Sequence, residues 1–174
     1  VGEVKTDKIK NIMEFAGSYP HDLVFLPRIK RLLLSSSTSG DLNDAHNFLI
    51  SIDKISGNEI QRLPVGNKKG RSAPAPGPML HVQGFTPPTV LILNTLGSQL
   101  KGLIWDNNIS NFKITNIFDF KSIKAQMPLD FVLDYEQKKL YVTTIKPGQL
   151  HVFDFRNNQP KINTRETINL AGGS

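Results

Sequence analysis

Short apolar runs separated by turn-forming residues fill most of this chain, and two pairs of these runs repeat at a fixed distance. Residues 20–25 and 30–35 form one pair, and residues 128–133 and 138–143 form a second pair 108 residues later. Runs of this length, rich in Leu, Val, Phe and Tyr and bounded by Pro, Gly, Asn or charged residues, are typical of β-strands. The repeat therefore predicts an all-β array built from similar units.

The similarity continues downstream of both pairs. Residues 48–53 match residues 149–154, so that Asp53 corresponds to Asp154 at an offset of 101, and the first copy carries extra residues within 38–46. Each unit then consists of four strands joined by turns and loops, which is the composition of a propeller blade. We therefore predict an all-β fold, a β-propeller segment of about three four-stranded antiparallel blades.

A divergent unit lies between the two copies. Residues 89–94 and 102–106 have the pattern of buried strands, and residues 112–117 alternate as a half-buried strand does. The predicted boundaries, in chain order, are a last strand of a preceding blade at 1–17, a blade at 18–66, a Pro/Gly-rich basic loop at 67–88, the divergent blade at 89–127 and a blade at 128–174. A short helix over 8–16 is the alternative for the first segment, because its apolar residues have helical spacing.

One strand pair carries a family resemblance. Lys139-Leu140-Tyr141-Val142-Thr143-Thr144, followed by Gly148, Val152 and Asp154, is similar to the YVTN-type β-propeller repeat, with Thr144 in place of the family's Asn. The first unit departs further, having Leu-Leu-Leu-Ser-Ser in the same place. The resemblance implies a propeller and favours a secreted or cell-surface location.

Three blades are too few for a closed ring. Closed propellers have about 4–8 blades, and an open arc leaves unpaired edges and an exposed sheet face. We therefore expect this segment to belong to a 6–8-bladed ring, whose further propeller blades come from the same longer protein or from another chain.

Composition limits the chemistry. The chain has no cysteine, which excludes disulfides and thiolate metal ligands, and no apolar stretch approaches the roughly 18 residues of a membrane helix. The net charge is +6. Its densest basic group, Lys68, Lys69 and Arg71, is a candidate polyanion site, but no stacking aromatic occurs before Phe85. A solvated loop is the simpler interpretation, and this pattern argues against nucleic acid as a partner.

The candidate ligand site is His21, Asp22 and Asp130, because both copies place an Asp just before a predicted innermost strand, near the central channel. Two such carboxylates can contribute oxygens to a hard cation, which needs about 6–8. The alternative is structural, with each Asp capping its turn through hydrogen bonds to the backbone, and the recurrence of the Asp in both copies favours this alternative. His21 does not recur and is the stronger functional candidate of the three.

No catalytic set is recognisable. Residues 41–46 resemble a calcium loop only superficially, since no Gly stands at the sixth position and Ile52 stands at the twelfth. His151 alternates with apolar neighbours and is predicted to face solvent or a neighbouring blade. The sequence favours a ligand- or protein-binding module that presents a rigid loop face, with no cofactor or metal identified. The alternative is part of a lactonase- or quinoprotein-like propeller enzyme with a central-channel metal or ligand site.

The repeat also predicts a core. The residues expected to be buried in matched strands are Val24, Leu33, Ile50, Ile52, Val132, Tyr141, Val142 and Phe153.

Overall fold

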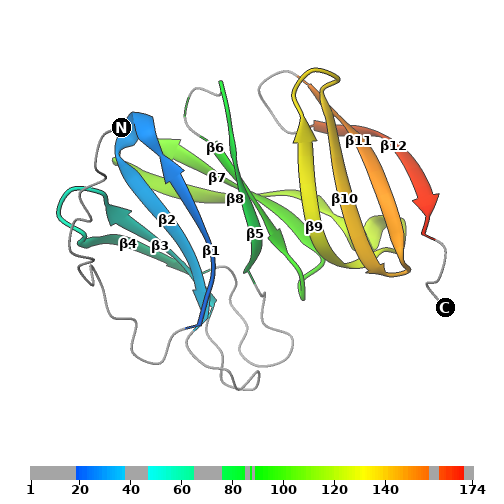
Figure 1. Cartoon of the computed structure of the whole chain (residues 1–174), viewed down its shortest axis with the longest axis horizontal. Helices are drawn as coiled ribbons and strands as arrows, with labels where there is room; N and C mark the ends of the chain where they lie inside the picture. Colours follow the sequence, from blue (N-terminus) through cyan, green and yellow to red (C-terminus); the bar gives the residue numbers. More distant parts are fainter. Residues whose placement is uncertain are drawn as a thin grey trace, which may run out of the picture.

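A computed structural model gives the architecture for residues 19–37, 47–64, 76–84, 87, 89–156 and 161–170. These residues form twelve strands in three four-stranded antiparallel sheets (Figure 1). The predicted strand at 1–17, the extra residues at 38–46 and the basic group at Lys68, Lys69 and Arg71 lie outside the described residues. The all-β prediction, with three blades of four strands, is confirmed.

Each sheet is a simple meander in chain order. The first sheet contains β1 (Tyr19–Leu26), β2 (Arg31–Ser37), β3 (Asn47–Asp53) and β4 (Glu59–Pro64). The second contains β5 (Pro76–Val82), β6 (Thr89–Asn94), β7 (Gln99–Asp106) and β8 (Asn111–Asp119). The third contains β9 (Gln126–Asp134), β10 (Lys139–Lys146), β11 (Gln149–Arg156) and β12 (Lys161–Asn169). Two 3₁₀ turns, η1 (Pro27–Ile29) and η3 (Phe120–Ile123), complete the assignment, and no helix in the described ranges could cross a membrane.

The three first strands are the innermost ones. β5 contacts both β1 and β9. Figure 1 shows these three strands side by side, with β2–β4 to the left of β1 and β10–β12 to the right of β9. This radial order of meander sheets is the arrangement of propeller blades.

The second sheet begins earlier than the sequence predicted. We expected only a loop over 67–88, yet β5 occupies Pro76–Val82. Proline is tolerated there because β5 is an edge strand that pairs only with β6, so Pro76 and Pro78 remove no hydrogen bond from a central ladder. The blade therefore includes part of the predicted loop.

The core has two main apolar layers, one on each side of the second sheet, and a smaller cluster of Leu34, Ile50 and Ile52 on the first sheet. β6 is buried along its whole length, and its residues alternate between the layers: Val90 and Ile92 pack toward the first sheet, and Leu91 and Leu93 toward the third. A strand covered on both faces favours a continuous apolar run, which explains Val-Leu-Ile-Leu between the buried polar ends Thr89 and Asn94. The rim of the first interface is polar, where the Gln61 side chain exchanges hydrogen bonds with the Phe112 backbone at 2.9 and 3.1 Å.

The burial predictions are largely confirmed. Five of the eight residues are buried: Leu33, Ile50, Ile52, Val142 and Phe153. Val24 and Tyr141 are half-buried. The prediction for Val132 is wrong, since 60% of it is exposed. Val132 pairs with Tyr141 on the face of the third sheet that points away from the second sheet, whereas Leu133 and Val142 point into the core.

Candidate functional site

A β-bulge interrupts the beginning of each innermost strand. In β1 the register shifts between Pro20 and Asp22, which leaves His21 as the extra residue, and in β9 the shift between Pro128 and Asp130 leaves Leu129 in the same role. β5 has a comparable shift between Pro76 and Met79. Bulges redirect side chains and bend the strand locally. The motif Pro-x-Asp is therefore a bulge signal in both recognisable copies.

Asp22 connects two blades. Its Oδ1 accepts a hydrogen bond from the backbone N–H of Leu23 at 2.8 Å, and its Oδ2 accepts one from the backbone N–H of Met79 in β5 at 2.6 Å. Hydrogen bonds to an ionised acceptor are shorter and stronger than neutral ones. Both carboxylate oxygens therefore serve the backbone, which supports the structural interpretation of this residue.

Asp130 has the same local geometry without the second contact. Its Oδ1 accepts from the backbone N–H of Phe131 at 2.8 Å, and its backbone carbonyl accepts from Thr143 Oγ1 at 3.3 Å. The corresponding contact in the first sheet runs from Ser35 Oγ to the Asp22 carbonyl at 3.4 Å. Asp130 is exposed, and within the described part of the chain its Oδ2 has no hydrogen-bond partner.

His21 lies on the bulge itself, exposed and next to Asp22 in sequence. Desolvation by neighbouring atoms lowers its pKa below the ordinary value, which favours the neutral imidazole as a ligand or proton acceptor. Among the described residues, no group of three or more His, Asp or Glu side chains is arranged to hold a metal ion. A ligand site at His21, Asp22 and Asp130 stays a prediction.

His151 is buried rather than exposed to solvent. Its Nε2 lies 3.1 Å from Thr144 Oγ1 and its Nδ1 lies 3.4 Å from Thr167 Oγ1, and its ring packs near Phe120 and Phe153. Phe120 belongs to η3, which follows the second sheet, so of the two expected surroundings the neighbouring blade is the correct one. A polar residue in this position is satisfied by its neighbours and is part of the core.

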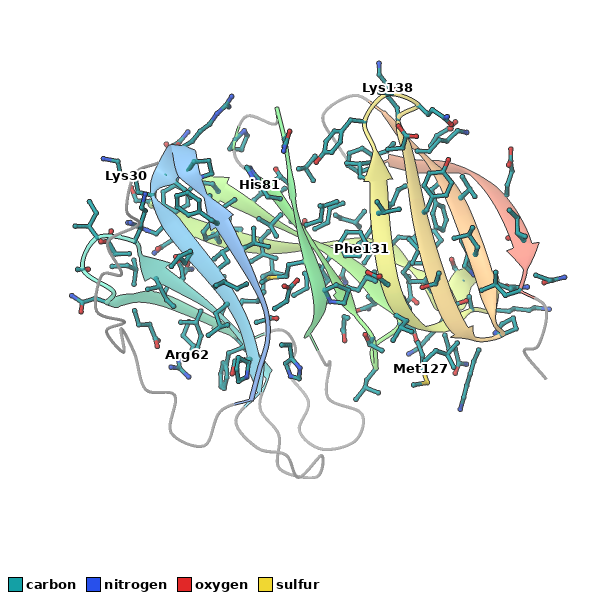
Figure 2. All side chains as sticks on the ribbon, in the orientation of Figure 1. Lys30, Arg62, His81, Met127, Phe131 and Lys138 are labelled. Atoms are coloured by element: carbon teal, nitrogen blue, oxygen red, sulfur yellow. The ribbon has the colours of Figure 1, made fainter. Side chains whose placement is uncertain are left out.

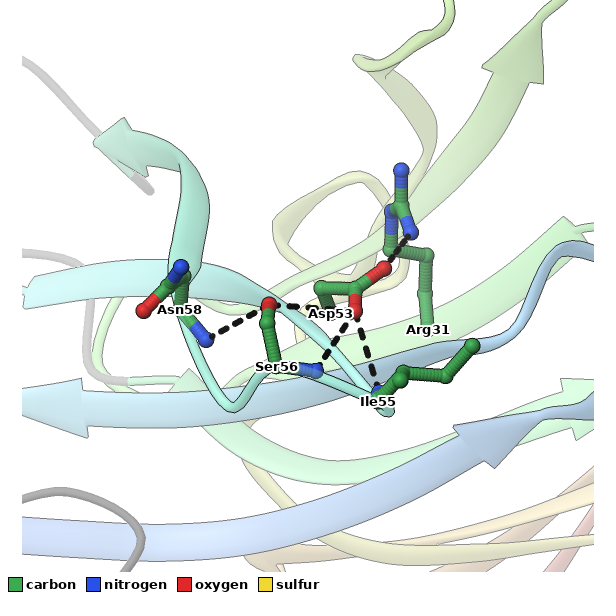
Figure 3. A network of polar contacts seen from close by, with 5 residues as sticks. All are labelled: Arg31, Asp53, Ile55, Ser56 and Asn58. Atoms are coloured by element: carbon green, nitrogen blue, oxygen red, sulfur yellow. Dashed lines mark hydrogen bonds and ion pairs between the residues drawn. The ribbon is translucent and has the colours of Figure 1, made fainter.

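The turns at one end of the sheets are fixed by aspartates. Asp53 Oδ1 accepts from the backbone N–H groups of Ile55 and Ser56 at 3.0 and 2.9 Å, and Oδ2 pairs with Arg31 Nη1 at 2.7 Å (Figure 3). The backbone hydrogen bond from Ser56 is the main cause of a lowered pKa for Asp53. Because the side chain replaces backbone partners within the turn, the turn has little freedom left.

The same device recurs in the other two sheets. Asp106 Oδ1 accepts from the backbone N–H of Asn108 at 2.9 Å, and Asp134 Oδ1 accepts from those of Glu136 and Gln137, both at 2.9 Å. The turn after the first strand is also bonded to the third strand or to the turn that follows it: Lys54 N–H donates to the Lys30 carbonyl, and the N–H of Phe155 in β11 donates to the Lys138 carbonyl. These contacts order the turns at this end of each sheet, and we call this end of the three sheets the turn face.

Figure 2 shows the position of the turn face. Lys30, His81 and Lys138 lie at its end of the sheets, and Arg62 and Met127 lie at the opposite end. The face has basic side chains on both outer sheets, since Arg28, Lys30, Lys54 and Lys138 are all exposed. The pKa of His81 is lowered, mainly by desolvation and secondly by the positive charge of Arg28.

Sequence reasoning missed two ion pairs at this end of the sheets. Arg31 with Asp53 and Lys139 with Asp154, at 2.7 and 2.6 Å, occupy equivalent positions in the first and third sheets. The signal was present, since a basic residue recurs at the start of the second strand and an Asp recurs at the end of the third. A cross-strand ion pair can be predicted only when the register between the two strands is known. The repeat offsets relate one copy to the other and do not give the register between two strands of the same sheet.

Comparison with known proteins supports the fold. No protein-family model matches the chain, and no curated protein matches it. A solved structure of a luciferin-regenerating enzyme, a β-propeller, superimposes with a TM-score of 0.60 at 11% sequence identity, covering 91% of this chain and 48% of that one. The chain thus spans about half the length of that protein. At this identity the likeness concerns the fold alone, and the chain is an all-β protein built of propeller blades.

Proposed function

We propose that the chain is a ligand- or protein-binding β-propeller module of the YVTN type, and that the turn face is its binding surface. The observation that carries this proposal is the recurrence of aspartate-locked turns, at Asp53, Asp106 and Asp134, in all three sheets. Binding by loops that are already ordered loses less conformational entropy than binding by loops that must become ordered. Because one fold hosts many functions, the proposal rests on this surface and not on the propeller itself.

The charge of the turn face suggests the kind of partner. Arg28, Lys30 and Lys54 on the first sheet and Lys138 on the third are exposed, and Lys54 Nζ lies 4.9 Å from the centre of the Phe25 ring. Exposed cations of this kind mainly steer and select partners of opposite charge. An acidic ligand or an acidic segment of a protein is the partner that fits.

A peptide library displayed on phage tests this proposal with a matched pair of variants. One variant carries Lys30→Glu with Lys138→Glu on the turn face, and the control carries Lys124→Glu with Lys146→Glu at the other end. The charge change is equal, and Lys30, Lys138 and Lys124 share a left-handed backbone conformation.

Peptides selected on the unchanged protein should be acidic and should lose at least about tenfold in affinity for the turn-face variant. They should bind the control normally. Binders that are indifferent to the turn-face change, or that depend on the control positions, would place the binding surface elsewhere.

A channel enzyme is the second candidate, favoured by two observations. His21 projects from a bulge of an innermost strand beside Asp22, and the structural neighbour is named as an enzyme. Elemental analysis of the purified protein, together with calcium titration of Asp130→Asn, decides this candidate. A stoichiometric cation that this substitution removes would support the enzyme, and its absence would leave the binding module.

A further inference from the structure

One face of the third sheet packs against no other sheet formed by the described residues. The strand register places Val132, Tyr141, Val152 and Glu166 in one row, and Asp130, Thr143, Leu150 and Ile168 in the next, all on the face opposite the core. We call these eight residues the outer face. Val132 and Ile168 are 60% and 52% exposed, although Val152 between them on the same face is only 8% exposed. Leu133 and Leu140 on the reverse face are buried against the second sheet. Large exposed apolar groups on one side of a sheet mark an interaction surface.

The internal repeat shows which face of the first sheet is equivalent to the outer face, and that face is covered by a blade. The outer face corresponds, at offsets of 108 and 101, to the face of the first sheet that contacts the second sheet. Leu33 corresponds to Tyr141 and Leu49 to Leu150; the first of each pair is 1% exposed in the interface, and the second is only half-buried. Equivalent residues are therefore covered by a blade in one copy and left open in the other.

Asp130 shows the same difference at a single atom. In the first sheet, Asp22 Oδ2 accepts the backbone N–H of Met79 from the first strand of the next blade. Asp130 has the same bulge, the same Oδ1 contact and the same carbonyl contact. Its Oδ2 is the acceptor for which the described residues provide no donor.

We propose that the outer face is an inter-blade face that takes a fourth four-stranded antiparallel blade, with Asp130 Oδ2 accepting a backbone N–H from the first strand of that blade. This interface is the equivalent, one blade further on, of the interface between the first and second sheets. The length of the structural neighbour, of which this segment covers 48%, leaves room for further blades, and closed rings have about 4–8. The proposal does not depend on the binding role of the turn face, and its test does not measure binding.

The cysteine-free sequence allows a direct test by thiol labelling. Val132→Cys is introduced into the 174-residue chain and, separately, into the complete gene product expressed from its own gene. Glu136→Cys, on an exposed turn of the same sheet, serves as the control. Iodoacetamide labelling is followed by mass spectrometry at the single introduced position. Iodoacetamide reacts with a covered cysteine only when the covering blade opens locally. Labelling at position 132 should therefore be about 100-fold slower in the complete product than in the 174-residue chain. The labelling rate at position 136 should be the same in both proteins.

Equal labelling at position 132 in both proteins would overturn the proposal. Protection that increases with protein concentration would overturn it as well, since the occupant would then be a second copy. The role of Asp130 is tested by adding Asp130→Asn to the complete product. Labelling at 132 should become at least about tenfold faster, because Asn retains one acceptor oxygen where two are needed. No change in the labelling rate would exclude Asp130 as the anchor.

Discussion

Asp22 should contribute measurably to the contact between the first two blades, and Asp22→Asn tests this. The carboxylate accepts two backbone hydrogen bonds, at 2.8 Å from Leu23 and at 2.6 Å from Met79, each on a different oxygen. Asn has a single acceptor oxygen, so one of the two bonds must be lost. A hydrogen bond to a charged group contributes about 1.5–3 kcal/mol, so the free energy of unfolding should fall by about that amount.

Asp130→Asn is the matched control within the same chain. Asp130 makes only the local bond, to Phe131 N–H at 2.8 Å, which the Asn oxygen can keep. Its cost in the 174-residue chain should be within about 0.5 kcal/mol, as for most surface substitutions. Urea unfolding followed by Trp105 fluorescence measures both variants. Equal losses for the two substitutions would show that the bond to Met79 adds nothing, and the reasoning about blade contacts would be refuted.

Three further predictions concern stability, the first two measured by the same urea unfolding and the third by thermal unfolding at several pH values. Val142→Asp should cost about 3–5 kcal/mol because Val142 is fully buried, whereas Val132→Asp on the outer face should cost within about 0.5 kcal/mol; similar losses would mean that the assigned faces are wrong. Gly97→Ala should cost about 1 kcal/mol, because the new Cβ would collide with the Asn94 side chain and break its hydrogen bond to the Gly97 N–H; an unchanged midpoint would contradict this. The lowered pKa of Asp53 contributes stability that is present above the unfolded pKa of about 3.9 and is lost as the pH falls toward the folded value. Asp53→Asn should therefore reduce the acid dependence of the melting temperature. An unaltered pH profile of the melting temperature would argue against this reasoning.

Several features of the fold could be predicted because they are local. The alternation of apolar and polar residues and the turn-forming residues between the runs predicted the strands, and the constant offsets predicted that two sheets would be alike. The recurrence of Asp22 and Asp130 favoured a structural role, and both carboxylates do accept backbone hydrogen bonds. Each of these inferences needs only neighbouring residues or a comparison of one unit with the other.

β5 shows where local reasoning was insufficient. Pro76 and Pro78 argue against a strand in general, but an edge position tolerates them, and the edge is defined only by the arrangement of the three sheets. The sequence could not reveal that the innermost strand of the second blade begins within the Pro-rich segment.

Val132 and Asp22 also depend on contacts between blades, which the local sequence does not reveal. Val132 has the apolar character of a core residue, yet it is exposed, because burial depends on which face of the sheet meets another blade. Asp22 has the character of a turn cap or a cation ligand, yet its Oδ2 bonds to Met79, which is 57 residues away in sequence. The sequence by itself determined the strands, their repetition and the apolar face pattern, because these follow from local sterics and from side-chain alternation. Only the tertiary structure decided which faces are covered and which polar atoms have partners, because both depend on contacts between blades.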